Sequence, residues 1–262
     1  MHLPGVLATV LLYAATISQA AVISQRLETV PAPLDEVRNS SAQRSLVPVG
    51  AIITHCTVPG TIALTFDDGP FIYTAQMLDT LAAHGARATF FLNGVNKGSI
   101  DGFAPLVVRA LAEGHQLGSH TWGHPSLPTL DYPAIVTQMT DLEAAFLRIV
   151  GFFPTYMRTP FLHFNDVVLK AMADLGYHVI GASIDTKDFE NDSPDLSWRS
   201  FQKFRAELDA GGSIVLAHDV HQTTVEVLVD NMLQEIAARG LTTVTVGQCL
   251  GDPPEFWYRT GR

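Results

Sequence analysis

Strand-like and helical patterns alternate along this chain from about residue 51, and this alternation strongly limits its possible folds. Seven apolar, β-rich runs predict strands at residues 61–66, 88–92, 115–119, 155–158, 177–183, 213–217 and 241–246. The patterns between them predict six helices, at residues 73–84, 103–113, 134–150, 166–175, 196–208 and 225–239. Alternation of this kind implies parallel strands joined by right-handed crossovers. A closed or nearly closed barrel and an open doubly wound sheet both fit this order.

The size and composition of the chain are those of one large α/β domain. It has 262 residues, of which 47% are hydrophobic and 16% are charged, so it can bury a substantial core. The formal net charge is −10. Nucleic-acid binding needs a basic face, so we expect no nucleic-acid partner.

The N-terminal region carries the features of a secretory signal. Residues 3–20 are apolar and end in Ser18-Gln19-Ala20, which predicts a signal peptide over 1–20 with cleavage after Ala20. The stretch is short for a membrane span, so we expect no membrane anchor and a secreted protein, extracellular or in the cell wall. Residues 21–50 are polar and without periodicity, which predicts a flexible leader or propeptide. Residues 51–250 then form the domain, and 251–262 a C-terminal tail.

Secretion also affects how the two cysteines are interpreted. Cys56 and Cys249 lie near the two ends of the predicted domain. Two buried thiols would be expected in a cytosolic protein, whereas a Cys56–Cys249 disulfide is expected in an oxidising compartment. Asn39 starts an Asn-Ser-Ser sequon and is a predicted glycosylation site. The sequon at Asn191 is followed by Pro194, which disfavours its use.

Polar residues recur at the C-terminal ends of the predicted strands, where barrel enzymes place their catalytic groups. The first strand ends in two adjacent acids, Asp67 and Asp68. These are either solvated turn residues or two groups with separate tasks. His120 and His124 follow the third strand at a spacing that lets two imidazoles bind one metal. An aspartate as third ligand would leave positions open for water and substrate.

Five short segments occur in the order found in one enzyme family. They are Thr65–Pro70 (TFDDGP), His120–His124 (HTWGH), Arg158–Phe161 (RTPF), Asp185–Phe189 (DTKDF) and Leu216–Asp219 (LAHD). Together they resemble the motifs of the polysaccharide deacetylases, the NodB-homology group of carbohydrate esterase family 4, over roughly residues 55–250. The two cysteines resemble those of the secreted fungal chitin deacetylases. The resemblance implies a distorted (β/α) barrel of about seven parallel strands in a single domain.

The resemblance implies a role for each matching residue. Asp68, His120 and His124 would hold a divalent metal, with zinc expected and cobalt as the alternative. Asp67 would be the general base, kept ionised by Arg158, and His218 the general acid, held by Asp185. The substrate-binding residues would be Phe161, through its backbone N–H, and Leu216, Phe189 and Pro160. Leu216 is either the floor of the acetyl pocket or an ordinary core residue of its strand. Asp188 and Asp219 either orient neighbouring functional groups or are solvated loop acids.

Two departures from the family pattern leave the sugar acceptor open. Phe161-Leu162 stands where Tyr-Gly is usual, and Phe189 where Trp or Tyr is frequent. The expected activity is hydrolysis of N-acetyl groups on N-acetylglucosamine residues of chitin or chitooligosaccharides by a monomeric enzyme. The alternatives are an O-acetyl esterase acting on acetylxylan or another acetylated polysaccharide, and a catalytically silent chitin-binding protein.

Overall fold

A curled parallel sheet surrounded by helices forms the centre of the computed structural model, which describes residues 45–262. The strands are β1 (Ile52–Ile53), β2 (Thr61–Asp67), β3 (Ala88–Leu92), β4 (Gln116–Ser119), β5 (Phe153–Pro154), β6 (Tyr156–Met157), β7 (His178–Ile180), β8 (Ile184–Asp185), β9 (Ile214–His218), β10 (Thr242–Thr243) and β11 (Tyr258–Arg259). The helices are α2 (Thr74–Ala83), α3 (Ala104–Ala112), α4 (Tyr132–Val150), α5 (Asp166–Leu175), α6 (Ser197–Asp209), α7 (Val229–Ala238) and α8 (Val246–Cys249).

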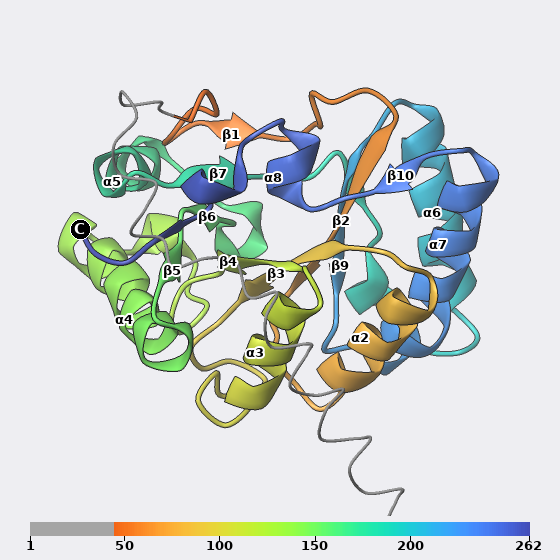
Figure 1. Cartoon of the computed structure of the whole chain (residues 1–262), viewed down its shortest axis with the longest axis horizontal. Coiled ribbons are helices and arrows are strands. Elements are labelled where there is room, and N and C mark those ends of the chain that lie inside the picture. The colour runs from red at the N-terminus through yellow and green to blue at the C-terminus, as the bar shows by residue number, and fades with distance from the viewer. Residues whose placement is uncertain (1–44) are drawn as a thin grey trace, which may run out of the picture. The chain divides into compact units, whose positions relative to one another are not determined.

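The strand order places the ends of β2, β4, β6, β8 and β9 along one edge of the sheet. The order is β1-β7-β6-β4-β3-β2-β9-β8, with β10 pairing β2, and every pairing in this sheet is parallel. Helices α2 to α7 lie around the outside of the strands (Figure 1). Because the carboxyl ends of parallel strands meet at one edge, the predicted functional residues are brought together there.

Strand β2 is buried on both faces, as expected for a parallel strand covered by helices. Ile62, Leu64 and Phe66 pack into the cluster that includes the apolar residues of α2 and α7. Ala63 belongs to a second cluster on the opposite face. Because side chains alternate along a strand, Asp67 at the end of β2 lies on the same face as Ala63.

The longer predicted strands are confirmed, β6 and β7 lie within the predicted runs 155–158 and 177–183, and four two-residue strands are additions. The runs at 61–66, 88–92, 115–119 and 213–217 correspond to β2, β3, β4 and β9. Strands β1, β5, β8 and β11 were not predicted, because two residues give no periodicity. The run predicted as strand 241–246 pairs only over Thr242–Thr243, and Thr245 then caps α8 with a capping box.

The predicted helix-end signals are confirmed where the structure describes them. The Asn165 side chain accepts a hydrogen bond from the N–H of Val168 and caps α5, and Gly176 ends this helix at φ 71°. Asp131 caps α4 in the same way, through the N–H of Ala134.

Residues outside the predicted domain limits also pack against it. The Ser45 hydroxyl donates to Asp252, and the N–H of Gly50 donates to the carbonyl of Tyr177. In the predicted tail, Trp257 is buried and β11 pairs with β5. The predicted signal peptide and Asn39 lie outside the described residues. Within residues 45–262 no helix combines the length and apolar character needed to cross a membrane.

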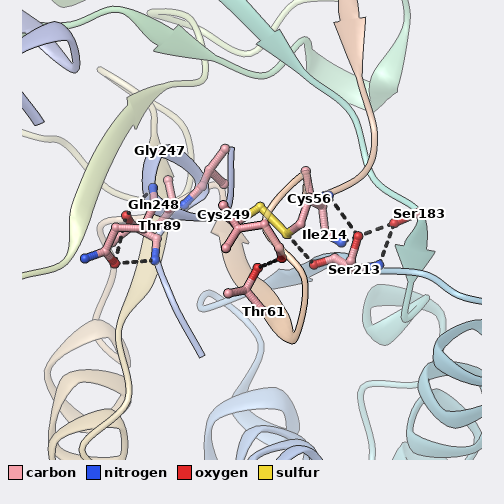
Figure 2. The surroundings of a disulfide bond; sticks show 12 residues. Cys56, Thr61, Thr89, Ser183, Ser213, Ile214, Gly247, Gln248 and Cys249 are labelled. Carbon is pink, nitrogen blue, oxygen red and sulfur yellow. Dashed lines mark hydrogen bonds between the residues drawn. A yellow bond between two sulfur atoms is a disulfide. The ribbon is translucent and has the colours of Figure 1, made fainter. Parts of the chain in front are cut away.

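A disulfide joins Cys56, before β2, to Cys249, at the end of α8, as predicted (Figure 2). The two cysteines are 193 positions apart in the sequence. Backbone hydrogen bonds tie the same place, because the N–H groups of Thr57 and Val58 both donate to the carbonyl of Cys249. The start and the end of the domain are therefore linked both covalently and through the backbone.

Loss of the disulfide should lower the stability of the domain. The double substitution Cys56→Ser and Cys249→Ser is expected to reduce the free energy of unfolding by about 4–5 kcal/mol, because the unfolded chain gains conformational freedom. Urea unfolding followed by circular dichroism measures this change. Wild-type protein unfolded with and without reductant is the control, and equal midpoints for the variant and the oxidised wild type would contradict the prediction.

Candidate active site

Three potential metal ligands converge at the ends of β2 and β4. Ligand atoms of Asp68, His120 and His124 all lie within 4.8 Å of one another. Nε2 of His124 is 3.1 Å and Nε2 of His120 is 3.7 Å from Oδ1 of Asp68. Two imidazole nitrogens and one carboxylate oxygen suit zinc and leave coordination positions open. The donor set present thus fits the metal site that the family resemblance implies.

The backbone around these ligands adopts sparsely populated conformations. Asp68, Thr121 and His124 have φ values of 73°, 72° and 55° although none is glycine. Such conformations cluster at functional sites, where the surrounding structure holds them in place. Nδ1 of His120 lies 2.8 Å from the carbonyl oxygen of Arg158, which leaves Nε2 directed at the ligand cluster. Asn96 donates to Oδ1 of Asp68 at 2.9 Å.

Asp67 forms a buried ion pair with Arg158. Nη1 of Arg158 donates to Oδ1 of Asp67 at 2.8 Å, and both side chains are almost fully buried. Burial raises the pKa of the Asp67 carboxyl above its ordinary value, while the charge and hydrogen bond of Arg158 oppose this rise. The other oxygen, Oδ2, lies 3.7 Å from Nε2 of His120. Asp67 is therefore fixed on one side by Arg158 and faces the ligand cluster on the other.

His218, at the end of β9, is paired with Asp188. Nδ1 of His218 lies 2.7 Å from Oδ1 of Asp188, and Oδ2 accepts from the N–H of His218 at 2.7 Å. The Thr224 hydroxyl also donates to Oδ2. Burial alone would lower the pKa of His218, but Asp188, followed by Asp67 and Asp68, raises it to about 9. His218 is therefore a cation at neutral pH.

The prediction that Asp185 holds the His218 ring was wrong, because Asp188 and not Asp185 pairs with this histidine. Asp185 ends β8, and its side chain pairs with Nζ of Lys187 at 3.0 Å. Lys187 then takes a left-handed conformation at φ 52°, and the 3₁₀ turn Asp188–Glu190 brings Asp188 beneath His218. The turn, which the sequence spacing does not reveal, decides which of the two acids reaches the histidine.

One cavity of about 390 Å³ is lined by the three potential metal ligands together with Asp67, Asp185 and His218. Leu216 is nearly buried in its lining, whereas Phe161 and Phe189 are exposed at its rim. The ring of Phe161 stands edge-on to that of His124, with 4.6 Å between the ring centroids. Pro160 is buried and is not among the residues lining the cavity, in contrast to the role implied for it.

Further residues that were not predicted as site residues line the same cavity. They are Lys97, Leu162, Lys187 and His221. Leu162 was noted only as a departure from the family pattern, and Lys187 lies within the Asp185–Phe189 motif but was given no role. Lys97 and His221 lie outside the five motifs. Asp219, the second acid left open by the sequence, is fully buried. Burial raises the pKa of Asp219 to about 7, and its Oδ2 accepts a hydrogen bond from Thr74.

Comparison with known proteins points to one family. Residues 54–180 match the family model described as Polysaccharide deacetylase. A chitin deacetylase of Pestalotiopsis sp is 54% identical over 219 residues, which are 84% of this chain and 73% of that protein. A protein of Arthroderma benhamiae named probable peptidoglycan-N-acetylglucosamine deacetylase is 52% identical over 221 residues, or 84% of this chain, which spans about half (51%) of its length.

A solved structure extends the similarity to the fold. The structure of the chitin deacetylase from the fungal pathogen Colletotrichum lindemuthianum matches with a TM-score of 0.80 at 45% identity. The match covers 82% of this chain and 98% of that one. The predicted barrel-type α/β fold in a single domain is thereby confirmed.

Proposed function

The chain belongs to the polysaccharide deacetylase family, and we propose that it is a metal-dependent chitin deacetylase. It hydrolyses the N-acetyl groups of N-acetylglucosamine residues in chitin or its oligomers. The observation that carries this proposal is the meeting of three units on one cavity: the Asp68–His120–His124 cluster, the Asp67–Arg158 pair and the His218–Asp188 pair.

Asp68, His120 and His124 would hold a divalent cation, with zinc expected and cobalt as the alternative. When bound, such a cation lowers the pKa of a water ligand toward about 7 and polarises a carbonyl group. The pKa of His120 supports this assignment, because burial lowers it to about 3 and keeps the imidazole neutral and able to bind a metal.

Asp67 and His218 divide the proton transfers of amide hydrolysis between them. Asp67 accepts a proton from the attacking water, and Arg158 holds this carboxylate in place. His218 starts as a cation because of Asp188 and donates a proton to the leaving nitrogen. A base and an acid that begin in opposite protonation states are what this reaction needs.

Neutral groups of the cavity would position the substrate. The backbone N–H of Phe161 is proposed to bind the oxyanion, and Leu216 to form the floor under the acetyl methyl group. Phe189 and the exposed ring of Phe161 supply apolar walls at the rim. Aromatic and aliphatic walls with few polar groups are typical of small-ligand sites.

Acetate release from chitin pentamer tests the proposed function. The protein loaded with zinc or cobalt should release acetate, and lose this activity on chelation. Inactivity of the metal-loaded protein toward N-acetylglucosamine polymers would contradict the proposal. Initial rates on peptidoglycan and acetylxylan separate chitin from a second acetylated polymer, and the name of the Arthroderma relative makes peptidoglycan the first competitor to include.

Removal of one proposed ligand should weaken zinc binding. His124→Ala is expected to lower zinc affinity by at least about 100-fold, since loss of groups that merely orient ligands costs up to this much. His84→Ala is the matched control, because His84 pairs with Asp230 away from the site. Competition with a fluorescent chelator measures the affinity, and equal zinc affinity of the two variants would refute the ligand assignment.

We propose that the enzyme is secreted and acts as a monomer outside the cell or in the cell wall. The Cys56–Cys249 disulfide supports an oxidising compartment. Detection of the protein in culture medium, and its molar mass by light scattering, test the two parts of this proposal separately.

A further inference from the structure

Two segments of the chain leave the sheet side by side at the catalytic edge. Strands β2 and β9 are parallel neighbours, and Asp67 is paired in register with His218. The proposed ligand Asp68 and then Gly69 follow the end of β2, and Asp219 follows the end of β9. A contact between these two segments can therefore fix the position of the ligand relative to the acid.

Asp219 makes this contact from a fully buried position. Its exposed fraction is 0%. A Cβ atom at position 69 would lie 2.5 Å from Oδ1 and 2.8 Å from Oδ2 of Asp219, far inside van der Waals contact. The carboxyl group of Asp219 thus occupies the space that a side chain at position 69 would need, and only glycine fits beside it.

The carboxyl group of Asp219 is itself held in place by the start of α2. Its Oδ2 accepts from the hydroxyl of Thr74, whose oxygen accepts in turn from the N–H of Phe71 at 2.9 Å. Its Oδ1 has no hydrogen-bond partner among residues 45–262. A buried polar atom without a partner costs free energy, so stability alone does not explain an acid at this position.

The end of β3 holds the other side of the same turn. The N–H of Asn93 donates to the carbonyl of Gly69 at 2.9 Å. The side-chain amide of Asn93 also donates to the carbonyl of Thr121 at 3.0 Å, in the segment between the two histidine ligands. The turn after Asp68 is therefore clamped between Asn93 and Asp219.

We propose that Asp219 is a positioning residue of the deacetylase, whose carboxyl group fixes the turn after Asp68 and so holds this ligand in place relative to His218. This inference rests on the proposed function, because it takes Asp68 as a metal ligand and His218 as the acid. Groups that orient metal ligands typically contribute about 10–100-fold to metal affinity or activity.

Removal of the Asp219 carboxyl group should weaken zinc binding. Asp219→Ala is expected to lower zinc affinity about tenfold, because the turn loses its support on one side. Asp219→Asn keeps the shape of the side chain and an acceptor for Thr74, and should retain most of the affinity. Competition with a fluorescent chelator measures these values.

Asp252→Ala is the matched control for a purely structural effect. Asp252 is also a buried acid, and it accepts from the hydroxyls of Ser45 and Tyr156 and does not line the catalytic cavity. Its loss should lower the stability of the domain and leave zinc affinity unchanged. The visible spectrum of the cobalt-loaded protein, which reports ligand geometry, should change in Asp219→Ala and stay the same in Asp252→Ala.

A substitution at Gly69 separates positioning from general destabilisation. Gly69→Ala places a methyl group against the Asp219 carboxyl and should lower zinc affinity by itself. In the Asp219→Ala background this carboxyl is gone, so the same methyl group should cost much less affinity. Additive losses, or wild-type zinc affinity in Asp219→Ala, would overturn the inference.

Two further outcomes are separable in the same experiments. If Asp219→Ala does not fold, Gly69→Ala tests the contact alone, and wild-type zinc affinity in that variant would overturn the inference. If the wild type binds zinc but releases no acetate from any polymer, the proposed function fails. The zinc affinities of the variants still test the role of Asp219 in that case.

Discussion

Asp67→Asn should abolish most of the deacetylase activity, with kcat/KM for chitin pentamer lowered by about 10²–10⁴-fold. The amide is nearly the same size as the carboxylate but cannot accept the proton of the attacking water. Because the metal ligands are untouched, zinc affinity should stay that of the wild type. Acetate release and zinc titration on the same preparation measure the two quantities.

The control for this substitution must separate chemistry from folding. Asp67→Asn leaves Arg158 buried without its carboxylate partner, and breaking a buried ion pair can cost about 3–5 kcal/mol of stability. Zinc affinity and circular dichroism therefore serve as folding controls, and Asp79→Asn removes an exposed acid on α2 for comparison. An Asp67→Asn protein with wild-type turnover would refute the assignment of the base.

Asp188→Asn should lower activity at neutral pH and change the pH profile. His218 must be protonated to act as the acid, and its pKa of about 9 means that wild-type activity is lost as pH rises through about 9. Without the Asp188 charge and hydrogen bond, the pKa of His218 loses the two largest effects that raise it, while burial still lowers it and only Asp67 and Asp68 oppose this. The alkaline limb of kcat/KM is then expected well below pH 9, with a loss of about 10²-fold or more at pH 8.

Asp185→Asn is the matched comparison for Asp188→Asn. Asp185 pairs with Lys187, whereas the hydrogen bond and ion pair of His218 go to Asp188, so this substitution should leave the alkaline limb of the profile in place. The readout is the position of the limb, which a general loss of stability would not move. A shift with Asp185→Asn and none with Asp188→Asn would restore the original sequence-based assignment.

The His218–Asp188 pair contributes to the stability of the folded protein, and this contribution depends on pH. The folded-state pKa of His218 is raised above its ordinary value of 6.5. Its stabilisation is therefore fully present below about pH 6.5 and is lost as pH rises through about 9.

The sequence predicts the main architecture because long buried strands and helices leave strong periodic signals. The runs that became β2, β3 and β9 are examples. Two-residue strands such as β1 and β8 depend on their neighbours in the sheet and leave no such signal. The capping box at Thr245, which ends the strand predicted over 241–246, is a local signal that apolar composition outweighed.

The candidate site was predictable where strand ends alone fix the side chains. Asp67 and Asp68 follow this rule. Asp67 lies on the same face of β2 as Ala63, and Asp68 follows it in a left-handed conformation. The two adjacent acids thus serve two partners, Arg158 and the histidine cluster. The assignment failed at Asp185, where a left-handed residue and a 3₁₀ turn redirect the chain.

The disulfide between Cys56 and Cys249 has a consequence for proteolysis. A single cut in any loop between these two cysteines divides the backbone into two pieces that stay joined through sulfur. The pieces keep their mutual effective concentration, so the sheet can remain assembled around the cut. A nicked molecule would run as one band without reductant and as two bands with it. A chain cut once between the two cysteines therefore stays one covalent molecule until the disulfide is reduced.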